Sequence, residues 1–219
     1  MLNTANIEPS WLDQFAKETM ATNDNYGITY DYGSIMHYGA LSASKNGKPS
    51  MVPYDRKYIE TLGSHFVSFY ELLMLNTHYK CLDKCKADRS AAKCKMGGFP
   101  HPRDCSKCIC PSGYGGKLCD QKPTGCGSIL NAGEKYQNAG RYGRKSFCRN
   151  IRKRGLCEML LLDTDGVALD GCPYAGVEIK TQADQRMTGY RYASPSFCIN
   201  SSNNSGIIVN ITVERYKNR

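Results

Sequence analysis

The sequence lacks three features, and each absence narrows what the chain can be. It has four histidines, and no two of them are four residues apart: His37, His65, His78 and His101. A helical H-E-x-x-H zinc site, which needs two histidines at that spacing, is therefore missing. No apolar run approaches the roughly 20 residues of a membrane-spanning helix. The residues after Met1 also lack the basic and apolar stretches of a secretory signal peptide.

Cysteine is absent from the first 80 residues, although the chain contains 12 cysteines. Seven of them lie from Cys81 to Cys119, in a stretch so poor in aliphatic residues that it needs cross-links to offset its chain entropy. Disulfides persist in secreted or lumenal compartments, so we expect an extracellular protein, with a cytosolic zinc module as the alternative. Because export requires a signal, we also expect that Met1 is not the start of the native precursor.

The remaining surface signals agree with secretion. N-glycosylation sequons begin at Asn200, Asn203 and Asn210. The formal net charge is +9, and its excess is concentrated in a basic cluster without an intervening acid: Arg141, Arg144, Lys145, Arg149, Arg152, Lys153 and Arg154. Outside the cell such a cluster favours an acidic glycosaminoglycan or an acidic protein as partner, and neither nucleic acid nor membrane is expected. A solvated face of two strands is the alternative interpretation.

Two short helices are predicted before Cys81. The first begins near Ser10 and places Trp11, Leu12 and Phe15 on an apolar side. Long loops follow it, rich in glycine and tyrosine and without a clear hydrophobic period.

The second helix has a stronger local signal. Ser68 and Glu71 form a capping box, and Leu72, Leu75 and Tyr79 recur at the spacing of one helical face. No strand pattern accompanies the two helices. We therefore expect this segment to lack an independent core and to need a partner layer that the chain does not contain.

The nine residues Y-D-Y-G-S-I-M-H-Y from Tyr30 to Tyr38 include S-I-M-H-Y, which resembles the Met-turn of the astacin family of metzincin zinc endopeptidases. M-V-P at 51–53, L-G at 62–63 and N-T-H-Y-K-C at 76–81 extend the resemblance. It implies that residues 1–81 are the C-terminal subdomain of an α+β peptidase domain, mostly irregular with two short helices.

The resemblance also implies roles for individual residues. Met36 would support a zinc ion from below, and Tyr38 would stabilise the reacting oxyanion or act as an auxiliary zinc ligand. His37 would be structural, and the histidine ligands of the family motif H-E-x-x-H-x-x-G-x-x-H are missing. We therefore expect a fragment or degenerate member of a secreted zinc metalloendopeptidase family that hydrolyses peptide bonds in proteins. Alone, the chain should be inactive and hold no Zn2+ stably.

Residues 82–122 resemble an EGF-like domain. C-I-C-P-S-G-Y-G-G-K-L-C ends the segment at Cys119, and C-K-M-G-G begins at Cys94. Six cysteines allow 15 connectivities. The resemblance implies the pairs Cys85–Cys105, Cys94–Cys108 and Cys110–Cys119. No calcium site is expected, because the residues just before Cys85, Leu82-Asp83-Lys84, offer one carboxylate.

Residues 126–219 resemble a CUB domain, a β-sandwich, through C-P-Y-A-G-V-E-I from Cys172 to Ile179. Buried strands are predicted over 156–162 and 209–214. The resemblance implies the disulfides Cys126–Cys148 and Cys172–Cys198. Ala175 stands where some CUB domains have a calcium-binding aspartate, so calcium is not expected here either.

Cys81 and Cys157 remain outside these pairs. In astacins the cysteine that ends the catalytic domain pairs with one near that domain's start, which implies that Cys81 is unpaired in this chain; a Cys81–Cys157 bridge is the less favoured alternative.

A second function fits the same residues: a non-catalytic extracellular EGF–CUB protein that docks matrix or other protein partners.

Overall fold

The structure is a computed structural model. It describes residues 1–121, 123, 137–138, 146–151, 156–161, 171–172, 177–192, 197–201 and 208–210. The helices in these residues are short. Three are 3-10 helices and two are α-helices: η1 (Thr4–Asn6), η2 (Pro9–Phe15), η3 (Arg56–Thr61), α1 (Phe69–His78) and α2 (Asp83–Lys86).

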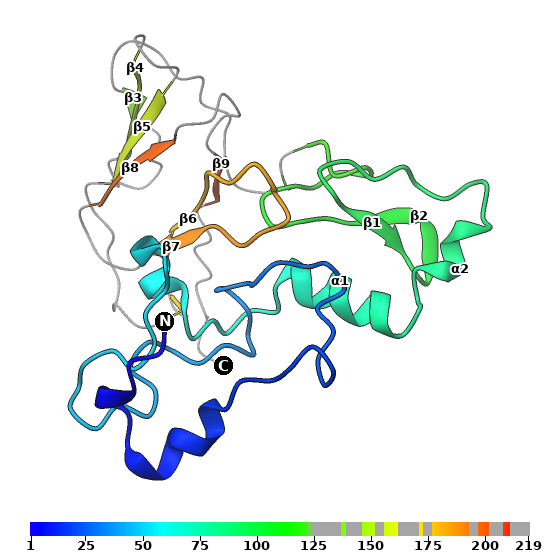
Figure 1. Cartoon of the computed structure of the whole chain (residues 1–219). Helices are drawn as coiled ribbons and strands as arrows, with labels where there is room; N and C mark the ends of the chain where they lie inside the picture. The colour runs from blue at the N-terminus through cyan, green and yellow to red at the C-terminus, as the bar shows by residue number, and fades with distance from the viewer. Residues whose placement is uncertain are drawn as a thin grey trace, which may run out of the picture.

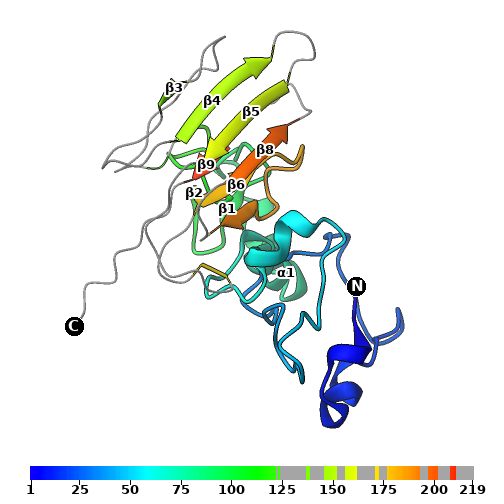
Figure 2. The same ribbon diagram turned by 90° about the vertical axis from the view of Figure 1, so that its left-hand side faces the viewer.

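The described strands form three antiparallel sheets (Figure 1). The first pairs β1 (Phe99–His101) with β2 (Asp104–Ile109). The second has the order β3-β4-β5-β8, with bounds Gln137–Asn138, Ser146–Ile151, Leu156–Leu161 and Phe197–Ser201. The third has the order β7-β6-β9, with bounds Tyr190–Tyr192, Val177–Lys180 and Ile208–Asn210. Figure 2 shows the four-stranded sheet at the opposite end of the molecule from the N-terminal residues.

The helix predicted near Ser10 differs from expectation. It is the 3-10 helix η2, it begins at Pro9, and Glu8 is its N-cap without a side-chain capping bond. Proline suits a first helical position because its missing N–H would be unsatisfied there anyway. Trp11 and Leu12 are exposed, so the apolar side predicted for this helix covers no core.

The capping box of α1 is confirmed. The Ser68 hydroxyl accepts from the Glu71 N–H at 3.2 Å, and the Glu71 carboxylate accepts from the Ser68 N–H at 2.7 Å. The predicted apolar face is wrong in part, because Leu75 and Tyr79 are exposed. Helix α1 buries its first turn instead, through Phe69 and Tyr70.

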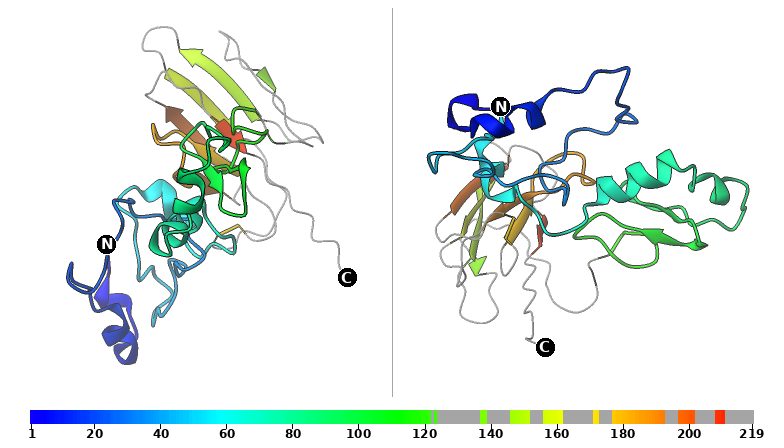
Figure 3. Two further views of the ribbon diagram at one scale, coloured as in Figure 1. Left: turned by 90° about the vertical axis from the view of Figure 1, so that its right-hand side faces the viewer. Right: turned by 90° about the horizontal axis from the view of Figure 1, so that it is seen from below.

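One core cluster joins three parts of the chain. Phe69 and Tyr70 of α1 pack near Phe99 of β1, and the Phe69 and Phe99 ring centroids are 5.5 Å apart. Met187, from the connection between β6 and β7, packs against the same cluster. The views in Figure 3 accordingly place α1 beside the β1–β2 pair. The first segment therefore shares its core with later segments of the chain.

The strand predicted over 156–162 is confirmed as β5, which ends at Leu161. Strand β9 (Ile208–Asn210) overlaps the strand predicted over 209–214 and begins one residue earlier. The positions beyond Asn210 lie outside the described residues. The expected absence of strands before Cys81 also agrees with the described structure, in which residues 1–80 form isolated bridges such as Leu2 with Met51 and no named strand.

Candidate functional site

The loop from Tyr30 to Tyr38 is a sequence of tight turns. The Asp31 carboxylate accepts from the Gly33 N–H at 3.0 Å, and the Asp31 carbonyl accepts from the Ser34 N–H at 3.4 Å. The Ser34 carbonyl then accepts from the His37 N–H at 3.1 Å. Aspartate and serine favour such turns because their side chains bond to the nearby backbone. The turns fix the direction in which the following residues leave the loop.

Glu71 anchors this loop to helix α1. One carboxylate oxygen completes the capping box, while the other accepts a short hydrogen bond from the Ser34 hydroxyl. The same oxygen accepts from the Met36 N–H at 3.3 Å, and the Ser34 hydroxyl also accepts from that N–H at 3.0 Å. The capping box is visible in the sequence, but its second role in holding the Met36 loop is not.

His37 is fully engaged by the loop itself. Its Nδ1 lies 2.6 Å from the Tyr38 carbonyl, which can only accept, so Nδ1 carries the proton. Its Nε2 lies 2.6 Å from the Tyr30 hydroxyl and accepts from it. Burial lowers the pKa of His37, which favours the neutral ring that this pattern requires. The structural role that the resemblance implies for His37 agrees with these contacts.

Met36 and Tyr38 point outward from the loop. Met36 is 82% exposed and Tyr38 is 65% exposed, although the Met36 N–H and the Tyr38 carbonyl are both held. Both side chains are therefore open to contact with another molecule, while the backbone that carries them is held.

Tyrosines connect the loop to strand β7. Tyr30 meets Tyr32 edge-on with centroids 5.0 Å apart, Tyr32 stacks on Tyr58 at 4.7 Å, and Tyr58 packs on Tyr190 at 4.5 Å. The Tyr190 hydroxyl donates to Asp55 at 2.7 Å. Burial, with the Asp55 carboxylate, raises the pKa of Tyr190 to about 12, and burial also raises that of Tyr58. Both of these phenols are therefore neutral at physiological pH.

A buried ion pair lies at the base of the β6–β7 hairpin. The Arg191 guanidinium is 2.9 Å from the Glu178 carboxylate, and the two side chains are only 11% and 7% exposed. Burial alone would raise the pKa of Glu178, but Arg191 and Lys180 together hold it below its usual value. Ser112 donates to Glu178 at 2.8 Å, and Arg191 donates to Ser64 at 2.6 Å. The pair therefore joins the hairpin to the first segment and to the disulfide-rich one.

The donors present do not fit a zinc ion. His37 has no lone pair left, His78 Nδ1 meets the Tyr26 hydroxyl at 2.5 Å, and His101 Nδ1 accepts from the Arg103 N–H at 3.1 Å. Zinc sites in proteins need three or four nitrogen, sulfur or carboxylate ligands. Within the part of the chain that the structure describes, no group of three or more His, Cys, Asp and Glu is arranged to hold a metal. Tyr38 alone is not such a site.

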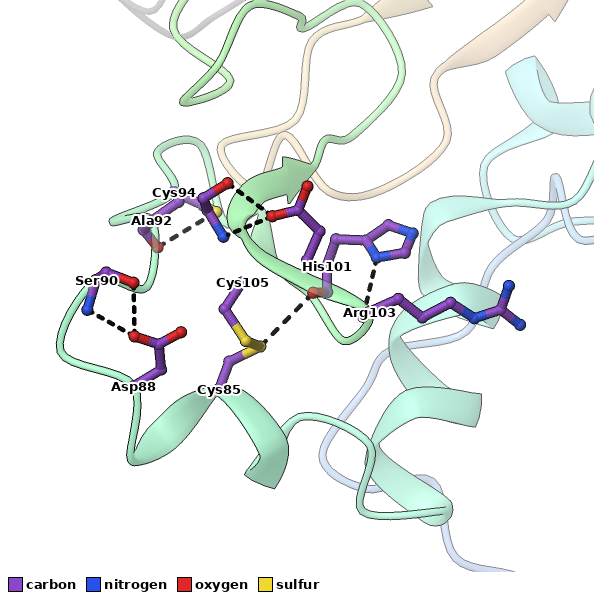
Figure 4. Close-up of a disulfide and its surroundings, with 10 residues drawn as sticks. Cys85, Asp88, Ser90, Ala92, Cys94, His101, Arg103 and Cys105 are labelled. Atoms are coloured by element: carbon purple, nitrogen blue, oxygen red, sulfur yellow. Dashed lines mark hydrogen bonds between the residues drawn. A yellow bond between two sulfur atoms is a disulfide. The ribbon is translucent and has the colours of Figure 1, made fainter.

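The disulfide-rich segment forms the three pairs that the EGF-like resemblance implies, Cys85–Cys105, Cys94–Cys108 and Cys110–Cys119. Figure 4 shows the first of them, with Cys85 Sγ 3.6 Å from the His101 carbonyl between α2 and the β1–β2 turn. Cys81 forms no disulfide with any described residue.

Several predicted sites depend on residues whose side chains lie outside the described part of the structure. They are the pairs Cys126–Cys148 and Cys172–Cys198, the extra Cys157, the sequons at Asn200, Asn203 and Asn210, the replaced position Ala175, and the basic cluster over 141–154. Among the helices that are described, none has the length and apolar character needed to cross a membrane.

Comparison with known proteins finds a family model that is similar to the first segment. Residues 1–80 match the model of the Astacin peptidase family. Zinc metalloproteinase nas-31 of Caenorhabditis elegans is 48% identical over 205 residues, which cover 88% of this chain and 33% of that protein. Zinc metalloproteinases nas-25 and nas-32 of the same organism are 38% and 34% identical, over 84% and 90% of this chain.

The chain spans about a third to a half of the length of these curated relatives, since the matches cover 33%, 49% and 32% of them. No solved structure matches the chain. The chain is thus related to the astacin metalloproteinases, and its Met36–Tyr38 loop lies inside the matched residues.

Proposed function

We propose that this chain, related through residues 1–80 to the astacin metalloproteinases, supplies the Met36–Tyr38 part of a secreted zinc endopeptidase site. The observation that carries the proposal is the presentation of Tyr38. Its phenol is 65% exposed while Glu71 and His37 hold the backbone on either side of Met36 and Tyr38. The backbone that carries this exposed phenol is thus fixed on both sides.

Tyr38 would act by hydrogen bonding. A phenol O–H directed at a scissile carbonyl donates to the oxygen on which negative charge develops, and so stabilises the transition state more than the ground state. Removing one such donor typically costs about 10² to 10³ in kcat. Met36 would support the metal region from below, as the resemblance implies. Zinc would polarise the carbonyl and supply the nucleophilic water when its ligands are provided.

The chain as given has no H-E-x-x-H motif, and His37, His78 and His101 already bond to other groups. We therefore infer that the chain alone neither retains Zn2+ nor hydrolyses protein. The oxidised, purified chain should release no peptides from an unfolded protein substrate with added zinc. Cleavage that stops when 1,10-phenanthroline is added, and that is lost in Tyr38→Phe, would contradict the inference.

Sequencing the transcripts that encode this chain tests where the missing histidine ligands come from. If the peptidase proposal holds, transcripts that encode this chain also encode an in-frame H-E-x-x-H-x-x-G-x-x-H and an export signal upstream of Met1. A complete transcript with an export signal and without the zinc motif would overturn it.

A second candidate is an extracellular binding protein, and the formation of three disulfides between Cys85 and Cys119 favours it. Here residues 82–122 would form an EGF-like module and residues 126–219 a CUB-like module, without bound calcium, docking matrix or other protein partners. The basic cluster over 141–154 would bind a sulfated glycosaminoglycan. Retention on immobilised heparin at physiological salt, lost when Arg152, Lys153 and Arg154 are changed to glutamine, is the expected result. Unchanged retention in that variant would exclude this cluster as the contact.

A further inference from the structure

The loop that carries Met36 and Tyr38 rests directly on the hairpin of β6 and β7. One point of close approach is between Gly33 and Thr188, which are far apart in the sequence. A Cβ atom added at Gly33 would lie 2.3 Å from Thr188 Cγ2, 2.7 Å from its Cβ and 2.8 Å from its Oγ1. Real contacts are never this short, so glycine is required here for space alone. Two segments touch at this point with no room for a methyl group.

Tyr58 joins the same two segments by other means. Its ring stacks on Tyr32 of the loop at 4.7 Å, while its hydroxyl donates to the Thr188 carbonyl at 3.3 Å. Gln182 of the hairpin donates a short hydrogen bond to that hydroxyl. Tyr58 is 5% exposed, so these bonds form away from water, where losing one leaves a polar group unsatisfied.

Buried polar groups lie on both sides of this contact. Lys180 of β6 is 1% exposed, and its ammonium donates to the Gln185 carbonyl at 2.7 Å. Burial lowers the pKa of Lys180, and the carboxylates of Glu178 and of Asp31 in the loop act against this shift. Asp31 Oδ2 is itself buried without a hydrogen-bond partner among the described residues.

We propose that residues 178–192 are a positioning element for the Met36–Tyr38 loop, with Thr188 as the positioning residue. Shape at Gly33 and the Tyr58 contacts hold the hairpin to the loop from one side, and Glu71 holds the loop from the other. The C-terminal segment therefore also helps to fix the backbone of the loop from which Tyr38 projects. The catalytic meaning of this position rests on the proposed function, whereas the contact itself does not.

The test compares Gly33→Ala with the double variant Gly33→Ala/Thr188→Gly. The added methyl group of Gly33→Ala has no space, so hydrogen exchange of the amides over 30–39 and over 178–192 should become roughly tenfold faster. Thr188→Gly removes all three atoms that the methyl group would meet, so the double variant should return to the exchange of the unmodified chain. This rescue is specific to a direct contact, since two independent losses of stability would add.

Gly47→Ala is the matched control. Gly47 has a φ of +70° and nothing within 4 Å of an added Cβ, so the change strains the same segment without touching the hairpin. It should leave exchange over 178–192 unchanged. Equal loosening of the hairpin by Gly47→Ala, or no rescue in the double variant, would overturn the proposal.

The unmodified chain provides a second measurement in case Gly33→Ala does not fold. A nuclear Overhauser cross-peak between the Gly33 α protons and the Thr188 methyl group is expected, and its absence in the folded, assigned chain would overturn the contact. Neither measurement uses zinc or a peptidase assay. The inference can therefore fail while the peptidase proposal stands, and the reverse is also true.

Discussion

Residues 1–80 and residues 81–121 are stabilised in different ways, although neither segment has a large core of its own. Both have little regular structure and too few aliphatic side chains for a core of their own. The second segment is cross-linked by three disulfides that close loops of 20, 14 and 9 residues in sequence separation. The first segment has no cysteine before Cys81 and relies on polar contacts, many of them with a distant hairpin.

The contacts of the first segment show this dependence. Thr61 accepts from the Arg191 N–H at 2.9 Å, Asp55 accepts from the Tyr190 hydroxyl at 2.7 Å, and the Glu60 carbonyl accepts from the Gly171 N–H at 2.9 Å. Each bond crosses more than 100 residues of sequence. One segment is thus held by covalent bonds within itself and the other by its neighbour, so different perturbations should break them.

Reduction should have the largest effect, and this effect should be greatest in the disulfide-rich segment. Loss of one native bridge in a small domain typically costs about 2 to 5 kcal/mol, and three are lost together. With a phosphine reductant, hydrogen exchange over 85–119 should approach that of an unfolded chain, while amides over 30–39 remain protected. Unchanged protection over 85–119 after complete reduction would show that cross-links are not what holds this segment.

Glu178→Gln should break the first segment's support. The substitution leaves the buried Arg191 without its counter-ion, which typically costs about 3 to 5 kcal/mol. Urea unfolding followed by tyrosine fluorescence would measure the loss. Lys107→Gln is the control in the other segment, because its pair with Asp104 has side chains 73% and 39% exposed and should change stability by less than about 1 kcal/mol. Equal losses would remove the distinction between the two segments.

Low pH should reduce the hydrogen-exchange protection of the first segment and leave that of the disulfide-rich segment unchanged. Burial raises the pKa of Glu178, but Arg191 and Lys180 lower it more, so its folded pKa lies below its unfolded value of 4.5. A depressed carboxyl pKa stabilises the fold above the unfolded value, and this stability is lost as the pH falls through the folded one. A hydrogen bond from Arg186 lowers the pKa of Asp184 to about 2, so the stability that Asp184 contributes is also lost as the pH falls.

Below about pH 4, protection of residues 30–39 and 178–192 should therefore fall together, while residues 85–119 stay protected by their disulfides. Exchange measured from pH 7 downward, corrected for intrinsic rates, would check this. Loss of protection over 85–119 at the same pH would contradict it.

Several of these features were predictable from sequence because they are local. The capping box of α1 needs two residues three apart, and β5 needs one apolar run. The three disulfides agree with the EGF-like resemblance, while spacing alone leaves their pairing open. Helix η2 was predicted less well, since a few apolar residues after Ser10 do not distinguish a 3-10 helix from an α-helix.

The support of the first segment was not predictable in this way. The expectation that its partner layer lies outside the chain is wrong in part, because the β6–β7 hairpin supplies one. The residues around Gly33 and Thr188 give no local sequence signal for a contact between positions so far apart in the chain. The additional role of Glu71 was hidden for the opposite reason, since its capping function already explained its presence.

Tyr58→Phe should have the smallest measurable effect of the series. It keeps the ring stack but removes a hydroxyl that donates to the Thr188 carbonyl and accepts from Gln182, so a loss of about 1 to 2 kcal/mol is expected. Tyr54→Phe is the control, because Tyr54 is 82% exposed. A Tyr58→Phe variant as stable as the Tyr54→Phe variant would show that the hydroxyl does not contribute to the contact.

The central claim is that this chain carries a presented tyrosine of an astacin-type site without the ligands that hold its metal. Equilibrium dialysis of the oxidised chain against micromolar Zn2+, followed by elemental analysis and compared with Tyr38→Phe, tests it most directly. The account predicts well under one zinc per chain after a wash in metal-free buffer, and no difference between the two proteins. One tightly retained zinc per chain that is lost in Tyr38→Phe would contradict it.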